Sequence, residues 1–345
     1  MTDCYVVHTF LRGARHDYGI FSGMVTQNQK RNGETPPDIL WHYTTQEGFL
    51  GIIKGKNLRA TNIFYLNDAT EYKYAKGLLK DVLGSYFPYT NLNNDLQNII
   101  NKVSLRIAED TMFDNSNLFD KHAKYKMLLT IQDAVEKLEF NETYILSFTK
   151  KGDDLNQWRA YCPHNNGFCI GFSKSELYKR TENLIARNAM FLEDCLYLKE
   201  KQENLIRQAI DEALTEFEKD FGNSADKKKT FNDCLLDFML RLLRIIPRLK
   251  HASFMEEKES RLIYVKLIKT AEEPVNFRAG KSMLVPYIEF PLSDKDDITI
   301  LKKIIVGPTP HMHLSVSAAK SLLETYKVRD CEVVRSEVPY RDWQG

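Results

Sequence analysis

Hydrophobic and polar positions along this chain follow two periods, and the change between them predicts short strands separated by long helices. Phe49, Ile52 and Ile53 recur at the spacing of an amphipathic helix. Runs rich in aromatic and β-branched residues predict strands at 39–44, 58–61, 143–149, 167–172, 188–197, 261–268, 276–285, 287–291, 301–307 and 332–336. Strands contributed by such widely separated parts of the chain predict an α+β fold.

The longest helical patterns lie at about 92–138 and 198–247, and strands resume on both sides of each. We therefore interpret them as helical insertions into a single α+β domain spanning 38–345. Residues 1–37 end in the polar, proline-containing segment QNQKRNGETPP and are expected to form an appended arm.

Composition limits the kinds of partner that this chain is expected to have. Of the 345 residues, 43% are hydrophobic, and 48 basic side chains nearly balance 47 acidic ones. Net charge therefore does not indicate a strongly polyanionic partner, although it leaves a local basic patch open. Six scattered cysteines suit a reducing compartment, and no apolar run approaches the ~20 residues needed to cross a bilayer. We expect a cytoplasmic protein without a membrane partner.

The most informative stretch is 250–266, KHASFMEEKESRLIYVK, where a helical region gives way to a strand. If 257–261 is extended, Glu257, Glu259 and Arg261 point to the same face of that strand. Neighbouring carboxylates repel each other unless cations, hydrogen bonds or a ligand compensate. One hypothesis is that Glu259 acts on a ligand while Glu257 and Arg261 tune it. The alternative is a solvated edge strand with an ion pair of little energetic value.

Aromatic residues supply further candidates for a binding site. His42 ends an apolar strand and could bond a ligand hydroxyl while Tyr43 offers a stacking face; the alternative is a core histidine in an aromatic cluster. Trp158 and Tyr161 are three residues apart and share a face if their segment is helical. They could enclose a flat ring or form part of the core.

Two polar groups have a structural interpretation, which the pattern favours, and a ligand-binding alternative. Asn67 and Asp68 precede a predicted helix, where Asp68 and Glu71 could form a capping box or Asp68 could position a ligand. A basic run at helical spacing predicts either a solvated helix face or a docking site for a nucleic-acid backbone; its members are Arg241, Arg244, Arg248 and Lys250.

Several common sites are not indicated by the sequence. It contains no phosphate-binding GxxxxGK[ST] loop, no GxGxxG opening a helix and no GxSxG nucleophile elbow. Cys162, His164 and Cys169 lack the close cysteine pair typical of structural zinc, so we predict no metal site.

Four sequence blocks, taken in order, resemble the family catalogued as domain of unknown function 2971. They are LWHYTTQEGFLGIIKGKNLRATNIFYLNDATEY, ILSFTKKGDDLNQWRAYCPHNNGFCIGF, KHASFMEEKESRL and IIVGP, followed by a closing YR. The resemblance covers about 38–345, interrupted by the helical insertions. The family is in turn distantly similar to ADP-ribosyltransferases, which implies a small split sheet, mixed or antiparallel, that binds NAD in a cleft.

This resemblance also implies roles for individual residues. His42 on the first strand would touch a ribose hydroxyl, and Ser147 would lie on a supporting strand. Glu259 would be the catalytic acidic residue, because a carboxylate bound to the 2′-hydroxyl stabilises the oxocarbenium-like centre left when nicotinamide departs. Glu257 could orient or deprotonate the acceptor, and Arg261 could hold a phosphate. The remaining cofactor-binding candidates are Tyr43, Asn67, Asp68, Trp158 and Tyr161.

The resulting expectation is an NAD-dependent ADP-ribosyltransferase that modifies an intracellular macromolecule, either RNA, DNA or protein. By analogy such an enzyme could be a toxin or a phage-defence effector with a neutralising antitoxin. The alternatives are a non-catalytic module of the same fold that binds a nucleotide or peptide, and a helical interaction scaffold.

Overall fold

The computed structural model describes residues 39–66, 70–87, 116–137, 140, 142–162, 167–184, 189–266, 274–280, 282–293 and 298–339. The predicted arm at 1–37, the 92–115 part of the first predicted insertion, and the candidates Asn67 and Asp68 lie outside these residues. Within the described part of the chain, no helix combines the length and apolar character needed to cross a membrane.

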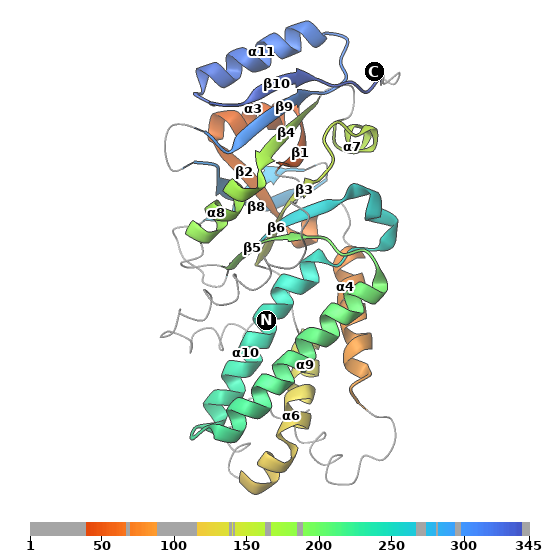
Figure 1. Ribbon diagram of the computed structural model, residues 1–345, viewed down its shortest axis with the longest axis vertical. Helices are drawn as coiled ribbons and strands as arrows, with labels where there is room; N and C mark the ends of the chain where they lie inside the picture. Colours follow the sequence, from red (N-terminus) through yellow and green to blue (C-terminus); the bar gives the residue numbers. More distant parts are fainter. Residues whose placement is uncertain are drawn as a thin grey trace. The chain divides into compact units, whose positions relative to one another are not determined.

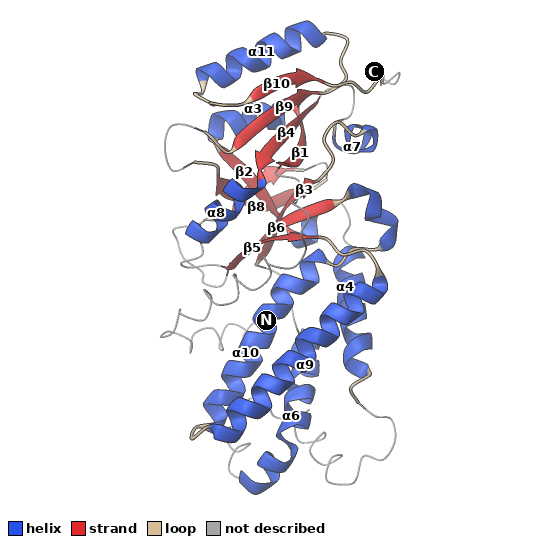
Figure 2. Ribbon diagram, in the orientation of Figure 1, coloured by secondary structure: helices blue, strands red, loops and turns tan. Residues whose placement is uncertain are grey.

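The described residues form two compact units, one helical and one built around a sheet. Among the described residues, those between 70 and 140 and between 196 and 252 belong to the helical unit, and those between 39 and 66, between 142 and 195 and between 253 and 339 belong to the sheet unit. Figures 1 and 2 show the elements of each unit. The helical unit contains α4 (Thr70–Gly84), α6 (Ser116–Lys137), α9 (Lys199–Asn223), α10 (Lys227–Ile245) and the 3-10 turn η5 (Ile246–Arg248).

Helices α9 and α10 form because their apolar residues recur on one face of each helix and pack together. Ile206, Ile210 and Phe217 are buried on α9, and Phe238 and Leu242 on α10. The two helices are separated at 224–226, where Asp226 caps α10 by accepting a hydrogen bond from the Lys229 N–H at 2.9 Å. The helical pattern predicted at 198–247 therefore forms two helices joined by a turn.

A buried polar network ties the start of α4 to the start of α9 within the helical unit. Glu71, in the first turn of α4, forms a 2.9 Å ion pair with Lys250, and both side chains are buried. The fully buried Gln202 donates hydrogen bonds to the carbonyls of Leu196 and Lys250 and accepts one from the Tyr74 hydroxyl at 2.7 Å. Buried polar groups require such partners, so these contacts fix the local geometry.

The described residues of the sheet unit form a ten-stranded sheet, which is larger than the small one we predicted. The strands are β1 (Ile39–Thr45), β2 (Asn57–Asn62), β3 (Thr143–Thr149), β4 (Gly167–Ser173), β5 (Ala189–Asp194), β6 (Glu259–Val265), β7 (Asn276–Ala279), β8 (Leu284–Pro291), β9 (Leu301–Val306) and β10 (Glu332–Arg335). The predicted single strand at 276–285 is interrupted at Gly280, whose N–H donates to the Met283 carbonyl at 2.9 Å and closes the β7–β8 hairpin.

The sheet is mixed and divides at β3. Its main order is β10-β9-β4-β1-β3-β2-β8-β7, and β6 and β5 extend from β3 outside this path. One edge of β3 pairs with β6 along its whole length. The other edge is shared: Tyr144 and Ile145 pair with β2, whereas Thr149 pairs with Trp41 of β1. Among the described strand pairs, β9–β10 is parallel and the others are antiparallel.

Opposite faces of the sheet carry two separate apolar clusters. The larger includes Phe148, Ile170 and Leu262, and it is covered by α3 (Gln46–Gly55), α8 (Lys174–Leu184) and α11 (Met312–Thr325). The smaller includes Tyr43 and Cys169 and is covered by α7 (Leu155–Tyr161). Because side chains alternate along a strand, neighbouring residues such as Leu40 and Trp41 contribute to different faces.

We predict that the buried Glu71–Lys250 ion pair is needed for the stability of the helical unit. Lys250→Met removes the cation and leaves the buried carboxylate without its partner, which is expected to lower the free energy of unfolding by about 3 kcal/mol. Urea denaturation monitored by circular dichroism measures this change.

Lys80→Met is the matched control, because Lys80 pairs with Glu136 at the surface and should cost less than about 1 kcal/mol. The double variant Glu71→Leu/Lys250→Met removes both charges and should recover most of the loss. A double variant as unstable as Lys250→Met alone would show that the unpaired charge is not the cause.

Candidate functional site

Strand β6 begins at Glu259, two residues before the predicted 261–268 strand, but the extended conformation considered for 257–261 does not reach back to Glu257. A 3-10 turn, η6 (Ala252–Glu257), comes first, and Lys258 then takes a left-handed conformation with φ 44°. The strand starts at Glu259. The prediction that Glu257, Glu259 and Arg261 share one strand face is therefore wrong for Glu257, since the left-handed residue redirects the chain between it and the strand.

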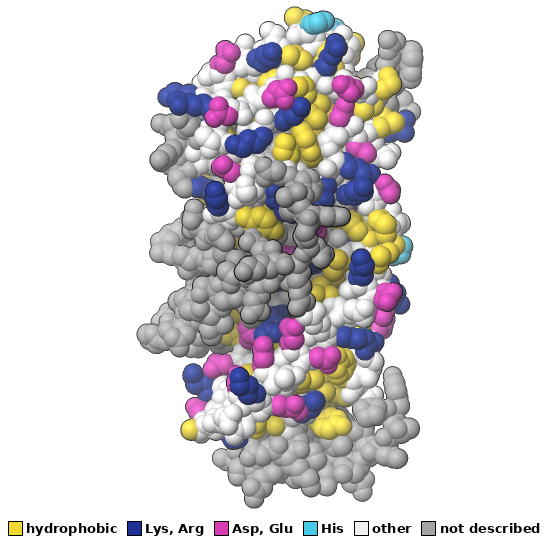
Figure 3. All heavy atoms as spheres, in the orientation of Figure 1, with side chains coloured by type: hydrophobic (Ala, Val, Ile, Leu, Met, Phe, Trp, Pro, Cys, Tyr) yellow, Lys and Arg dark blue, Asp and Glu magenta, His cyan; other side chains and the backbone are white. Residues whose placement is uncertain are grey.

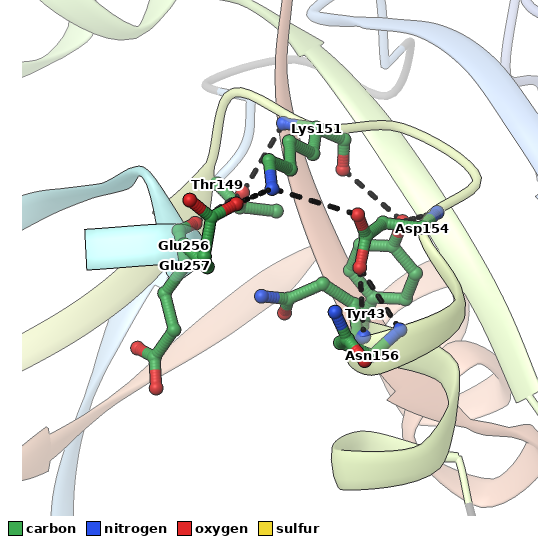
Figure 4. A network of polar contacts seen from close by, with 8 residues as sticks. Tyr43, Thr149, Lys151, Asp154, Asn156, Glu256 and Glu257 are labelled. Carbon is green, nitrogen blue, oxygen red and sulfur yellow. Dashed lines mark hydrogen bonds and ion pairs between the residues drawn. The ribbon is translucent and has the colours of Figure 1, made fainter. Parts of the chain in front are cut away.

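The turn before β6 is held to the end of β3 by side-chain and backbone contacts, shown in part in Figure 4. The Thr149 hydroxyl donates to the Glu257 carbonyl at 2.6 Å, and the Lys150 N–H donates to the Lys258 carbonyl at 3.1 Å. The Lys151 ammonium pairs with Glu256 at 2.9 Å. The Glu257 carboxylate itself points away from this network.

Glu259 and Arg261 form a buried, two-pronged ion pair. Arg261 Nε lies 2.8 Å from Glu259 Oε1, and Arg261 Nη2 lies 3.0 Å from Oε2. The two residues are only 6% and 3% exposed. Their spacing of two residues places them on the same strand face, as predicted. The parallel geometry is that of strong, orientation-specific guanidinium–carboxylate recognition.

The pair does not lie on a solvated edge strand, so that alternative from the sequence is excluded. Strand β6 is flanked by β3 and β5, and each of its residues is buried. In register, Glu259 is opposite Thr149, while Arg261 is opposite Ser147 on one side and Glu193 on the other. Residues in register share a face, so this face carries two hydroxyls, two carboxylates and one guanidinium.

His42 lies on the opposite face of the sheet from Glu259. Trp41, Thr149 and Glu259 are in register and share a face, so the next residue, His42, points the other way. Its ring meets Phe148 edge to face, with centroids 6.1 Å apart, and Nδ1 donates to the Ser147 carbonyl at 3.0 Å. The structure therefore does not bring the side chains of His42 and Glu259 into a common cleft.

Tyr43 and Trp158 form the smaller core cluster instead of enclosing a ligand ring. Trp158 is only 1% exposed and meets Tyr43 edge to face, with centroids 4.7 Å apart. The Tyr43 hydroxyl donates to the Lys151 carbonyl and accepts from the Asp154 N–H at 2.8 Å. Burial is the main cause that raises the pKa of Tyr43. Of the predicted aromatic group, Tyr161 is exposed, and its ring alone can stack on a ligand without repacking the core.

Sequence reasoning missed two acidic residues that accept hydrogen bonds from distant segments, one beside the smaller core cluster and one on the opposite face of the sheet. Asp153, at φ 56°, accepts hydrogen bonds from Trp158 Nε1 at 2.9 Å and from the Glu337 N–H at 2.7 Å. Asp194 accepts from Ser260 and Lys150, each at 2.6 Å. Burial would raise the pKa of Asp194, but these hydrogen bonds outweigh it and lower the pKa. Neither role has a sequence signal, because the partners are distant in the chain.

Cys162 and Cys169, which we considered as metal ligands from the sequence, are buried core residues. Cys162 and Cys169 lie in the smaller core cluster, and burial raises the pKa of the Cys162 thiol to about 12. Within the residues that the structure describes, no three His, Cys, Asp or Glu side chains are grouped as metal ligands, and His164 lies outside those residues.

The basic run from Arg241 on α10 to Lys250, just after η5, is neutralised at two of its positions. Arg241 forms ion pairs with Glu212, Glu216 and Asp237, and Lys250 pairs with Glu71. Figure 3 shows basic and acidic side chains interspersed over the face in view. Paired cations are poor anchors for a phosphate backbone, because binding would have to displace their carboxylates.

The burial of His42 predicts a pH dependence of stability. Desolvation lowers the pKa of His42, although its hydrogen bond to Ser147 opposes the shift. The unfolded chain therefore binds a proton more readily, and stability should fall as pH drops below the unperturbed value of about 6.5. His42→Asn, which cannot titrate, should show a smaller loss of unfolding free energy between pH 7 and 5 in urea melts. If the unfolding free energy of His42→Asn falls with pH as steeply as that of the wild type, groups other than His42 cause the loss.

The Tyr43 hydroxyl is predicted to stabilise the 151–154 loop. Tyr43→Phe leaves the ring in place but removes both hydrogen bonds, which is expected to cost about 1–3 kcal/mol of unfolding free energy. Tyr65→Phe is the matched control, since this exposed residue should change stability by less than about 0.5 kcal/mol. Equal effects of the two substitutions in thermal and urea melts would refute the structural role of Tyr43.

Comparison with known families agrees with part of the resemblance seen in the sequence. Residues 157–262 match the family described as "Protein of unknown function (DUF2971)". This segment runs from α7 to β6 and includes Trp158, Tyr161, Glu259 and Arg261, which supports the resemblance to that family over this part of the chain. No curated protein matches the sequence.

Proposed function

We propose that this protein is an NAD-dependent ADP-ribosyltransferase in which Glu259 is the catalytic carboxylate and Arg261 holds it in place. The observation that carries the proposal is the buried, two-pronged pair at the start of β6. Replacing a buried ion pair by apolar side chains is often neutral or stabilising, so folding alone gives little reason to keep one here. Active sites hold ionisable groups by burial and by specific charge partners, and the Glu259–Arg261 pair has both features.

The division of the sheet is the second supporting feature. In ADP-ribosyltransferases, which the family resembles, a split sheet holds NAD and a late strand supplies a glutamate. Here the sheet divides at β3, and the late strand β6 pairs with β3 and begins with Glu259. The family match ends at 262 and so includes both members of the pair.

The proposed step breaks the bond between nicotinamide and C1′ of the ribose. The bonding electrons leave with nicotinamide, and the positive charge that develops on the ribose is stabilised by Glu259 through the 2′-hydroxyl. A nucleophile on the acceptor then bonds to C1′ and releases its proton. Glu257, on the turn two residues before Glu259, is the candidate to receive that proton.

The geometry changes the supporting residues from those that the resemblance implied. Ser147 shares the face of Arg261 and remains a candidate, and Tyr161 remains as an exposed aromatic surface. The proposal assigns no ligand contact to His42, which points to the opposite face, or to Tyr43 and Trp158, which are core residues. The proposal includes a macromolecular acceptor, either RNA, DNA or protein, and a neutralising antitoxin.

The deciding experiment incubates the purified protein and a cell lysate with NAD labelled on its adenylate half. Glu259→Gln is expected to reduce nicotinamide release by at least about a hundredfold while retaining NAD binding. Glu289→Gln is the matched control, because Glu289 is an exposed glutamate on β8 of the same sheet. Label transferred to RNA, DNA or protein identifies the acceptor. If the wild-type protein neither binds NAD nor releases nicotinamide, the proposal is wrong.

A second candidate is a binding module of the same fold that takes a nucleotide without turning it over. The observation that favours it is that both oxygens of Glu259 already accept hydrogen bonds from Arg261. The enzyme is still compatible with this geometry, because an ionised carboxylate has about four lone-pair sites and can accept further hydrogen bonds from a substrate. NAD retained without nicotinamide release, equally by the wild type and by Glu259→Gln, would favour this module.

A further inference from the structure

The turn that delivers Glu259 into β6 is strained and must be held. Lys258 adopts φ 44°, a left-handed conformation that costs a residue with a Cβ atom free energy. Such a conformation persists where surrounding contacts fix it. Here the contacts come from the end of β3, which lies in register with the start of β6.

Thr149 is the centre of these contacts. Its hydroxyl donates to the Glu257 carbonyl at 2.6 Å and accepts from the Lys151 N–H at 3.1 Å. Thr149 is also the register partner of Glu259 and is 5% exposed. One side chain thus fixes the residue before the left-handed turn, while its backbone is paired with the residue after it. Figure 4 shows Thr149 between Glu257 and Lys151.

We infer that Thr149 is a positioning residue that sets the orientation of Glu259 toward its substrate by holding the turn at 257–258. This inference rests on the proposed function for its effect on turnover, but its structural part does not. Without the hydroxyl, Lys258 is free to leave the left-handed region and the start of β6 can shift. A carboxylate misplaced by about 1 Å can cost about a hundredfold in rate.

The test compares Thr149→Val, which keeps the branched shape without the hydroxyl, with Thr149→Ser, which keeps the hydroxyl. Thr149→Val should lower kcat for nicotinamide release at least about tenfold, with KM for NAD within about twofold, and Thr149→Ser should restore most of it. Thr130→Val is the matched control: Thr130 is also buried, and its hydroxyl donates to the Lys126 carbonyl within α6.

Amide hydrogen exchange separates this inference from the proposed function. Peptides covering 252–260 should exchange faster in Thr149→Val than in the wild type or Thr149→Ser, whether or not NAD is cleaved. If the wild type cleaves no NAD, the proposed function fails and exchange alone decides the inference. Thr149→Ala gives the same comparison if the valine variant does not fold. Unchanged exchange at 252–260, or unchanged kcat in an active protein, would overturn the role of Thr149.

Discussion

The double use of strand β3 is the constraint on which the sheet unit depends. One edge of β3 is hydrogen-bonded to β6 over seven register pairs from Thr143 to Thr149, while its other edge is divided between β2 and β1. A strand has only two edges for ladder hydrogen bonds, so β1 and β2 cannot both pair with β3 along their whole lengths. The sheet must therefore separate into two arms on that side. The end of β3 where β1 joins is also where the turn before β6 is fastened.

The Glu259–Arg261 pair illustrates how burial and chemistry are connected in this fold. Removing two charges from water is costly, and their attraction offsets this only when the geometry is good and other hydrogen bonds are satisfied. The two-pronged contact meets the first condition. The paired neighbours in register, Ser147, Thr149 and Glu193, give the face an unusually polar character for the middle of a sheet. The opposite face of the same strand, with Leu262 and Tyr264, belongs to the large apolar core.

The aromatic residues show why a residue type does not by itself indicate a ligand site. Tyr43 and Trp158 have the flat rings that a nicotinamide would need, yet they pack edge to face against each other. The polar atoms of both are used to hold the 151–154 loop, through the Tyr43 hydroxyl and through the bond from Trp158 Nε1 to Asp153. Their contribution to any chemistry on the sheet is thus indirect, through the shape of the loop that carries Lys151.

The sequence by itself determined the element types, the helical character of 198–247 and the shared face of Glu259 and Arg261, because these depend on local periodicity. It also indicated a resemblance to a family over about 38–345, and the family model matches 157–262 of that range. Only the tertiary structure decided that Glu257 precedes the strand, since its position depends on a left-handed residue fixed by Thr149, more than a hundred positions away. The same holds for His42: strand register, which arises from pairing between distant segments, decides the face to which each side chain points.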